Sequence, residues 1–181
     1  MNTEYAAGIF AGIFSALLVY LIIRKITRKE KLNNNDFDER QELVRGRAYK
    51  YGFFTLVILL TLVMAAFELG AGIPVTPGLA IFISLLISID VYAIYSIMHD
   101  AYFGIGANRR RYSLFFLIII LINAVGGFPN IQEFLRSGHT VLDLGSCANI
   151  TVAIAFLPVL AAMIAKNISD DKEDRNEESE A

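Results

Sequence analysis

The basic residues of this 181-residue chain are confined to short stretches that alternate with long apolar runs. Fifteen of its sixteen Lys and Arg residues lie within residues 24–50, 109–111 and 166–175, and only Arg136 lies elsewhere. Membrane proteins keep Lys and Arg mainly in their cytoplasmic loops, so this asymmetry is typical of a polytopic membrane protein with one fixed orientation. The hydrophobic fraction of 55% agrees, because a soluble domain of this length would need more polar surface.

Five apolar segments are close to the roughly 20 residues that a helix needs to cross the hydrocarbon layer. We expect transmembrane spans over residues 5–23, 51–69, 76–98, 112–128 and 147–165. The predicted fold is an all-α polytopic bundle of five transmembrane helices, with the amino terminus outside and the carboxyl terminus in the cytoplasm. In a four-span alternative the fourth segment re-enters on the cytoplasmic side. That alternative would place the basic cluster and the acidic tail on opposite sides of the membrane.

Helix-breaking residues separate the predicted spans. Residues 70–74 predict a short turn that makes the second and third spans an antiparallel hairpin. Gly and Pro residues within 126–129 are expected to stop the fourth span, and residues 131–136 to form a short helix on the outer surface. Pro158 would bend the fifth span without breaking it. The tail, residues 166–181, carries seven acids against three bases and no aromatic residue, which predicts disorder.

The loop between the first two predicted spans carries the clearest local signals. Asp36 or Asp38 can cap a helix, and Glu39 or Gln41 would complete a capping box in either register. A cytoplasmic amphipathic helix over residues 38–50 would then lead into the second span. Basic side chains in this loop and in the next cytoplasmic loop are the predicted contacts with anionic headgroups or a partner. They are Arg40, Arg45, Arg47, Lys50, Arg109, Arg110 and Arg111.

Polar residues inside the predicted spans are the remaining candidates for chemistry. Asp90 lies near the midplane of the third span, where a charged group costs at least about 2.5–3.5 kcal/mol. Ser88 lies on the same helix, and Asn123 lies at a comparable depth in the fourth span, where it could share a hydrogen bond with Asp90. The functional interpretation is a proton or cation site, and the structural one is an interhelical hydrogen bond. Glu68 lies too near the outer surface to meet Asp90.

The sequence contains no motif that names a reaction. His99 and Asp100 follow the third span, whereas His139 lies on the opposite face of the membrane, so a two-histidine metal site is not indicated. Residues 104–106 are only a fragment of a dinucleotide-binding motif, and Cys147 is the single cysteine. We therefore expect no metal, no cofactor and no enzymatic activity.

A resemblance to known proteins comes from residues 38–55, which read DERQELVRGRAYKYGFFT. This run resembles the signature of a group of small, uncharacterised integral membrane proteins of Gram-positive gut bacteria. A second block, from Val91 through His99 to Tyr112, is similar to the same group, and together the blocks cover about residues 5–130. The resemblance implies a multi-pass protein of the bacterial plasma membrane. It supplies no activity and no catalytic residue.

These observations favour a non-enzymatic integral membrane protein that engages a cytoplasmic or membrane partner through its basic loop. The expected partners are the bilayer with its anionic headgroups and a protein or a second copy, but not nucleic acid. The alternative is a small transporter, or the substrate-binding subunit of an uptake system, with Asp90 at the midplane site. A membrane enzyme would need ionisable groups that converge at one interface, and only His99, Asp100 and the nearby arginines offer them.

Overall fold

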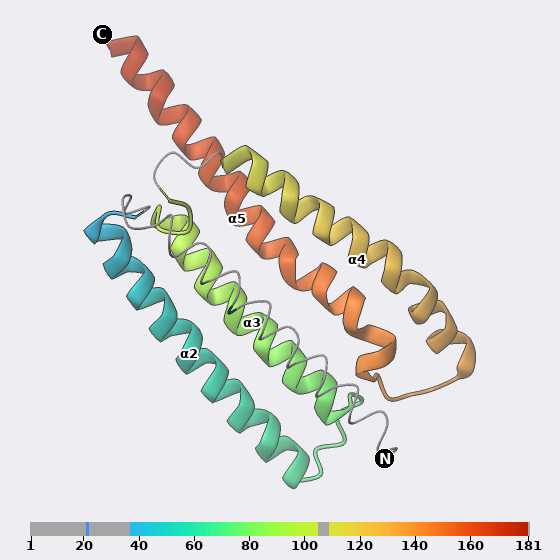
Figure 1. The fold of residues 1–181 in the computed structure, drawn as a ribbon. Helices are drawn as coiled ribbons and strands as arrows, with labels where there is room; N and C mark the ends of the chain where they lie inside the picture. The colour runs from blue at the N-terminus through green and yellow to red at the C-terminus, as the bar shows by residue number, and fades with distance from the viewer. Residues whose placement is uncertain (1–20, 22–36, 105–108, 181) are drawn as a thin grey trace. The chain divides into compact units, whose positions relative to one another are not determined.

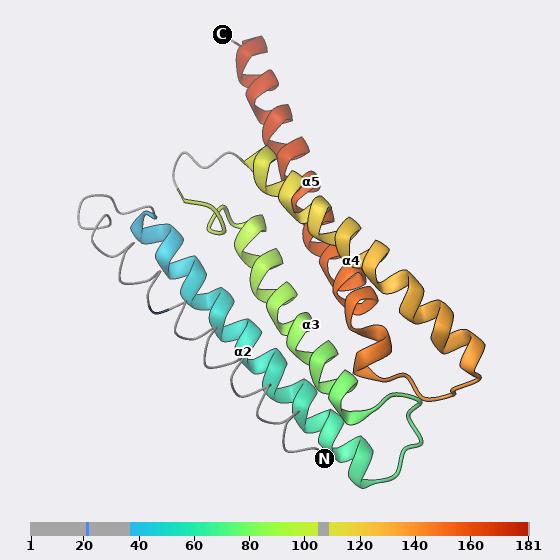
Figure 2. The same cartoon turned by 45° about the vertical axis from the view of Figure 1, so that its right-hand side comes forward.

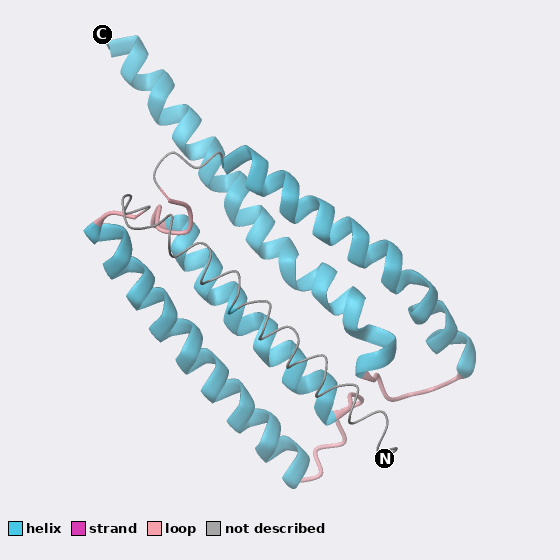
Figure 3. Cartoon of the chain, viewed as in Figure 1, coloured by secondary structure: helices cyan, strands magenta, loops and turns pink. Residues whose placement is uncertain are grey.

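The computed structural model describes residues 21, 37–104 and 109–180. The described part of the chain is almost entirely helical (Figures 1 and 3). Its helices are α2 (Glu39–Glu68), α3 (Pro77–Met98), α4 (Arg109–Ser137) and α5 (Leu144–Glu180). All four belong to one compact unit, residues 37–181. The predicted first span, residues 5–23, lies outside the described residues except for Leu21, which is helical.

The four helices lie in a row in the order α2, α3, α5, α4 (Figures 1 and 2). Helix α3 packs against α2 and α5, and α5 also packs against α4. The start of α2, the end of α3 and the start of α4 therefore gather at one end of the row, which we call the basic end. Helix α5 continues past the other three helices at this end (Figure 1).

All four helices are long and apolar enough to cross a membrane. Many large apolar side chains, including those of Ile58, Ile122 and Val125, are exposed rather than packed inside the row. The buried core is small and lies between α3 and α5, where Ala93 and Ile97 meet Val159 and Met163. Helices with apolar surface on nearly all sides are stable in lipid and not in water, so the protein is a membrane protein.

Helix α2 runs without interruption through the predicted amphipathic helix and the predicted second span. Its first turn is fixed by Asp38, whose carboxylate accepts a hydrogen bond of 2.6 Å from the backbone N–H of Gln41. The backbone N–H of Asp38 in turn donates to Oε1 of Gln41 at 3.2 Å. This reciprocal pair is a capping box, and it confirms the prediction in the Asp38 register.

Helix α3 begins at Pro77, directly after Thr76, and ends at Met98, where the sequence predicts a span over residues 76–98. The hydroxyl of Thr76 caps the helix, and Pro77 occupies a first-turn position that needs no donor. The turn before it joins α2 to α3 as an antiparallel pair. At the end opposite the basic end, this turn also contacts the connection between α4 and α5. The N–H of Thr76 donates to the carbonyl of Leu142 at 2.8 Å, and the N–H of Leu142 donates to the carbonyl of Pro74 at 2.9 Å.

The prediction that residues 126–129 stop the fourth span is wrong. Helix α4 continues to Ser137, so residues 131–136 form its last turns and not a separate surface helix. Gly127 allows α4 to pack closely against α5, because a Cβ at this position would lie only 2.7 Å from Cγ1 of Ile150 on α5. Pro129 interrupts a single backbone hydrogen bond, which a helix that packs against a neighbour tolerates.

Helix α5 continues to Glu180, across the tail for which the composition predicted disorder. At the start of this tail, Nζ of Lys166 lies 3.0 Å from the carboxylate of Asp170, one turn further along the helix. Acid–base pairs at this spacing favour the helix, and Glu, Lys and Arg are good helix formers. The extension lies past the ends of the neighbouring helices (Figure 1).

Candidate functional site at the basic end

Polar side chains connect the helices at the basic end. Gln41, which completes the capping box of α2, also reaches the loop that follows α3. Its Nε2 donates a hydrogen bond of 2.6 Å to the carbonyl of Asp100 and a longer one of 3.4 Å to the carbonyl of Phe103. One amide side chain therefore caps α2 and holds the α3 loop.

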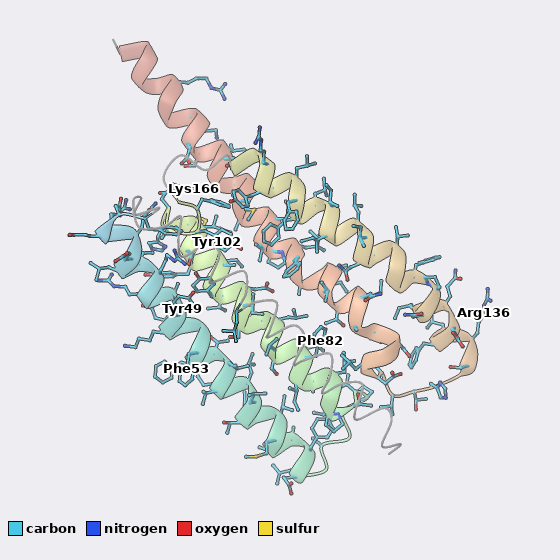
Figure 4. All side chains as sticks on the ribbon, viewed as in Figure 1. Tyr49, Phe53, Phe82, Tyr102, Arg136 and Lys166 are labelled. Atoms are coloured by element: carbon cyan, nitrogen blue, oxygen red, sulfur yellow. The ribbon has the colours of Figure 1, made fainter. Side chains whose placement is uncertain are left out.

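Asp100 connects this loop to α5. Its backbone has a φ of +58°, a left-handed conformation that Asp tolerates better than most residues. Its carboxylate lies 2.9 Å from Nζ of Lys166, which also pairs with Asp170. Figure 4 shows Lys166 on α5 at the basic end. The Lys166 side chain is only 19% exposed, so this contact is shielded more than a surface ion pair is.

A small cavity lies beside this ion pair. Its volume is about 10 Å³, which is close to the space that a single water molecule requires. It is lined by Ile97, Asp100, Phe103, Ser113, Met163, Lys166 and Asn167. A long hydrogen bond of 3.5 Å from Nδ2 of Asn167 to Oγ of Ser113 crosses from α5 to α4. The cavity is too small for an organic substrate.

Aromatic side chains cover the same loop. Phe103 packs on Tyr112 at 4.7 Å between ring centroids, and Tyr102 packs edge-on against Phe116 at 6.4 Å. Burial raises the pKa of Tyr102, and the nearby hydroxyls of Tyr92 and Tyr112 add to this effect. The Tyr102 hydroxyl therefore stays neutral and does not provide a base near pH 7.

His99 and Asp100 do not act as a pair. The His99 ring stacks on Tyr95 at 4.2 Å, and its Nδ1 donates a hydrogen bond of 2.8 Å to the Tyr95 carbonyl. The carboxylate of Asp100 points instead to Lys166. Within residues 37–104 and 109–180, no group of three or more His, Cys, Asp or Glu side chains is placed to hold a metal ion.

One face of the first turns of α2 is exposed. We call this face the α2 surface; it consists of Glu39, Glu42, Leu43, Gly46, Arg47 and Lys50. Leu43 is 69% exposed at its centre. Of the described helices only α3 packs against α2, so neither α4 nor α5 covers this face.

The other predicted basic contacts lie near the α2 surface or at the start of α4. Arg40 is exposed on the first turn of α2, whereas the guanidinium of Arg45 lies 3.9 Å over the ring of Phe37 in a cation–π contact. Arg111 is exposed in the first turn of α4. Arg109 and Arg110 begin that helix, and their side chains lie outside the described part of the structure.

The intramembrane candidates are not brought together. Oγ of Ser88 donates a hydrogen bond of 2.8 Å to the carbonyl of Gly52, which joins α3 to α2. Nδ2 of Asn123 donates to the carbonyl of Ile119 in its own helix at 2.9 Å. Helix α5 separates α3 from α4, so the hydrogen bond predicted between Asp90 and Asn123 is absent. Asp90 is 8% exposed, and its Oδ1 has no hydrogen-bond partner among the described residues.

A comparison with protein families identifies residues 22–127, more than half of the chain, as a match to a family of unknown function, DUF6442. The chain belongs to the DUF6442 family. The match covers α2, α3 and most of α4, and includes Gln41 and Asp100 but not Lys166. The expectation of an uncharacterised family is confirmed, and an origin in Gram-positive gut bacteria remains a prediction. A search of curated proteins and a search of solved structures found no match.

Sequence reasoning missed two residues that organise the basic end of this DUF6442 protein. Gln41 was expected only to cap α2, and no local pattern indicates that it also binds a loop 59 residues away. Lys166 was placed in a disordered tail. The best available signal was the spacing of Lys166 and Asp170, which is that of one helix face. Ser96, a third missed polar residue, is fully buried on α3, and its Oγ has no partner among the described residues.

A second polar region of this DUF6442 chain lies at the opposite end, near Arg136 (Figure 4). A cavity of about 300 Å³ is lined there by Asn130, Glu133, Phe134, Ser137, His139, Asp143, Gly145 and Ser146. Asp143 caps α5, because its carboxylate accepts hydrogen bonds from Oγ of Ser146 at 2.7 Å and from the backbone N–H of Ser146 at 3.1 Å. These bonds lower the pKa of Asp143. The carboxylate thus occupies the helix terminus that would otherwise attract an anion.

The Asp143 cap predicts a pH dependence of stability. The pKa of Asp143 is lower in the folded chain than in the unfolded chain, where it is about 3.9. The carboxylate therefore contributes its full stabilisation above about pH 3.9, and this contribution is lost as the pH falls through the lower pKa of the folded chain. Asp143→Ala should therefore be less stable than the natural chain at pH 7, and the two should converge below about pH 4. Asp143→Asn keeps a cap that does not titrate, so it should retain stability in acid. Thermal unfolding in detergent micelles from pH 7 to pH 2.5 measures this, and three parallel curves would contradict it.

Proposed function

We propose that the chain is a non-enzymatic integral membrane protein that binds a protein partner at the α2 surface. In this proposal the basic end faces the cytoplasm and the protein resides in a bacterial plasma membrane. The charge asymmetry of the sequence supports this orientation. The engagement of Asp100 and Lys166 with each other, beside a cavity of about 10 Å³, supports a role without catalysis.

The exposure of Leu43 is the observation that carries the proposal. Helix α2 is continuous, so its first turns extend the direction of the predicted span beyond Tyr51. Leu43 precedes Tyr51 by eight residues, or about 12 Å along the helix at 1.5 Å per residue. The headgroup layer is about 5–8 Å thick on each side. Leu43 therefore lies beyond the reach of lipid chains, and an apolar side chain that is 69% exposed there is better covered by a protein.

The charges of the α2 surface divide into two levels. Lys50 and Arg47 lie about 2–6 Å from the predicted span and suit contact with anionic headgroups. Glu39 and Glu42 lie further out than Leu43, next to the exposed Arg40 outside the α2 surface, and would contact a partner in water. The proposed surface thus combines a lipid anchor with a mixed-charge docking site.

Transport through an Asp90 site is the competing function. The unpartnered Oδ1 of Asp90 is the observation in its favour, because a buried polar atom in a membrane helix usually has a role. Asp90 lines neither the cavity at the basic end nor the one at the opposite end. A protein that binds a partner is favoured over a transporter, because Leu43 at the centre of the α2 surface is exposed.

Photo-crosslinking in intact membranes tests the proposal. A photoreactive residue at Glu42, Leu43 or Gly46 should give a protein adduct of one size, because these positions share the α2 surface. Met98 is exposed at the same end on α3 and should not give that adduct, and Ile58 should give lipid adducts. With the photoreactive residue at Gly46, Leu43→Glu should lower the yield about tenfold, because it buries a charge without a partner. Lipid adducts alone at all three positions would overturn the proposal.

A further inference from the structure

We propose that Lys166 on α5 positions the α2 surface, although α5 and α2 do not pack against each other. The effect passes through Asp100 in the loop after α3, which contacts both Lys166 and Gln41. We call these three residues the relay. The inference deepens the proposed function, on which it rests for the binding of a partner, and assigns control of that binding to a contact on another helix.

Gln41 attaches the start of α2 to the rest of the row. Of residues 38–43, all of which the structure describes, only Gln41 is not exposed. Its Nε2 donates a hydrogen bond of 2.6 Å to the carbonyl of Asp100, and its Oε1 accepts one from the backbone N–H of Asp38. The same amide thus closes the capping box and joins it to the loop after α3. A shift of that loop therefore changes the first turn of α2.

Asp100 occupies a position that helices usually give to glycine. The N–H of Asp100 donates to the carbonyl of Ile97 at 3.2 Å, and the N–H of Ala101 donates to the carbonyl of Ser96 at 2.8 Å. With the φ of +58° at Asp100, these bonds form a Schellman motif, in which the left-handed residue is most often Gly. Another residue keeps this conformation when its surroundings hold it. The carboxylate of Asp100, which Gly lacks, lies 2.9 Å from Nζ of Lys166.

The relay is the polar route from α5 to α2. Helix α3 lies between them, and in the described part of the chain α2 has no contact with α5 (Figure 1). Loss of the Lys166 ammonium releases the side chain of Asp100, whose carbonyl holds Gln41. Lys166 also pairs with Asp170, so the relay joins the tail of α5 to the start of α2.

Hydrogen exchange of the purified full-length chain in detergent micelles tests the relay without a partner. Lys166→Met should speed exchange of the backbone amides of residues 43–46 about two- to tenfold. Their acceptors are the carbonyls of residues 39–42, in the turn that the hydrogen bond from Gln41 to Asp100 restrains. Gln41→Glu should have the same effect, because it keeps the capping acceptor and removes the donor. The double variant should exchange no faster than either single variant, because both break one chain of contacts.

Three controls separate the relay from other effects on exchange. Lys172→Met removes an exposed charge of the same sign further along α5 and should leave exchange unchanged. Lys166→Arg keeps a cation for the Asp100 carboxylate and should keep most of the protection. The amides of residues 84–90, in the middle of α3, should exchange at the natural rate in every variant. Additive effects in the double variant, an unchanged rate in Lys166→Met, or an equal rise at residues 84–90 would each overturn the inference.

The crosslinking experiment of the proposed function measures the consequence for binding. With the photoreactive residue at Gly46, Lys166→Met should lower the yield of the protein adduct about two- to tenfold, and Lys172→Met should not. Faster exchange with a full adduct yield would show that Lys166 does not position the surface for its partner. Lipid adducts alone in the natural chain would overturn the proposed function, and the exchange rates would still test the relay by themselves.

Discussion

Gly127→Ala should lower the free energy of unfolding by about 1–3 kcal/mol, although Ala is the better helix former. A Cβ at this position would lie 2.7 Å and 2.9 Å from side-chain carbons of Ile150 and 2.9 Å from the Ile150 backbone nitrogen. A side chain can rotate away, but the backbone of α5 cannot yield without moving the whole helix. The substitution therefore forces α4 and α5 apart.

Gly126→Ala is the matched control on the neighbouring residue. Its Cβ would meet only the end of the Asn149 side chain, at 3.3 Å, which can move. We expect a neutral or slightly stabilising effect, because Ala is favoured over Gly in a helix by about 1 kcal/mol. Unfolding in mixed detergent micelles, followed by loss of helical circular dichroism, measures both variants. Equal stabilities of the two would show that α5 is not held against Gly127.

Asp100→Val should lower the free energy of unfolding by about 2–3 kcal/mol. A β-branched residue in the left-handed region costs roughly 1–2 kcal/mol, and loss of the pair with Lys166 adds up to about 1 kcal/mol. The loop that accepts the hydrogen bond from Gln41 would shift as well, which weakens the start of α2.

Two further variants separate the backbone from the charge. Asp100→Asn removes the charge but keeps a residue that tolerates a positive φ, so its cost should stay below about 1 kcal/mol. Asp100→Gly also removes the carboxylate but accepts the φ of +58° without strain. Both should be clearly more stable than Asp100→Val in the same detergent assay. A Gly variant as unstable as the Val variant would mean that the charge dominates.

The parts of the fold that follow from local chemistry could be predicted from the sequence. Asp38 and Gln41 mark the start of α2 because a capping box needs only residues three apart, and Thr76 with Pro77 marks the start of α3 in the same way. The end of α4 could not be predicted. Gly127 reads as a helix breaker until Ile150, which packs against it from another helix, is known.

The same distinction applies to the candidate site. Arg47 and Lys50 could be predicted on the helix that leads into the second span because the pattern along one segment is enough. The contacts of Gln41 with Asp100 and of Asp100 with Lys166 join residues that are about 60 positions apart. No periodicity encodes such a contact; it depends on how the helices are ordered in the row.

The backbone bridge between the two connections has a mechanical consequence. Helices α2 and α3 form one hairpin, and α4 and α5 form another. Opposite the basic end these hairpins are fastened through Thr76, Leu142 and Pro74 by main-chain groups, which a side-chain substitution does not remove. At the basic end the hairpins are held by side chains, namely the Asp100–Lys166 ion pair and the ring contacts of Tyr102 and Phe103 with α4, which substitutions can remove. If the hairpins ever separate, they should open at the basic end and pivot about the bridge.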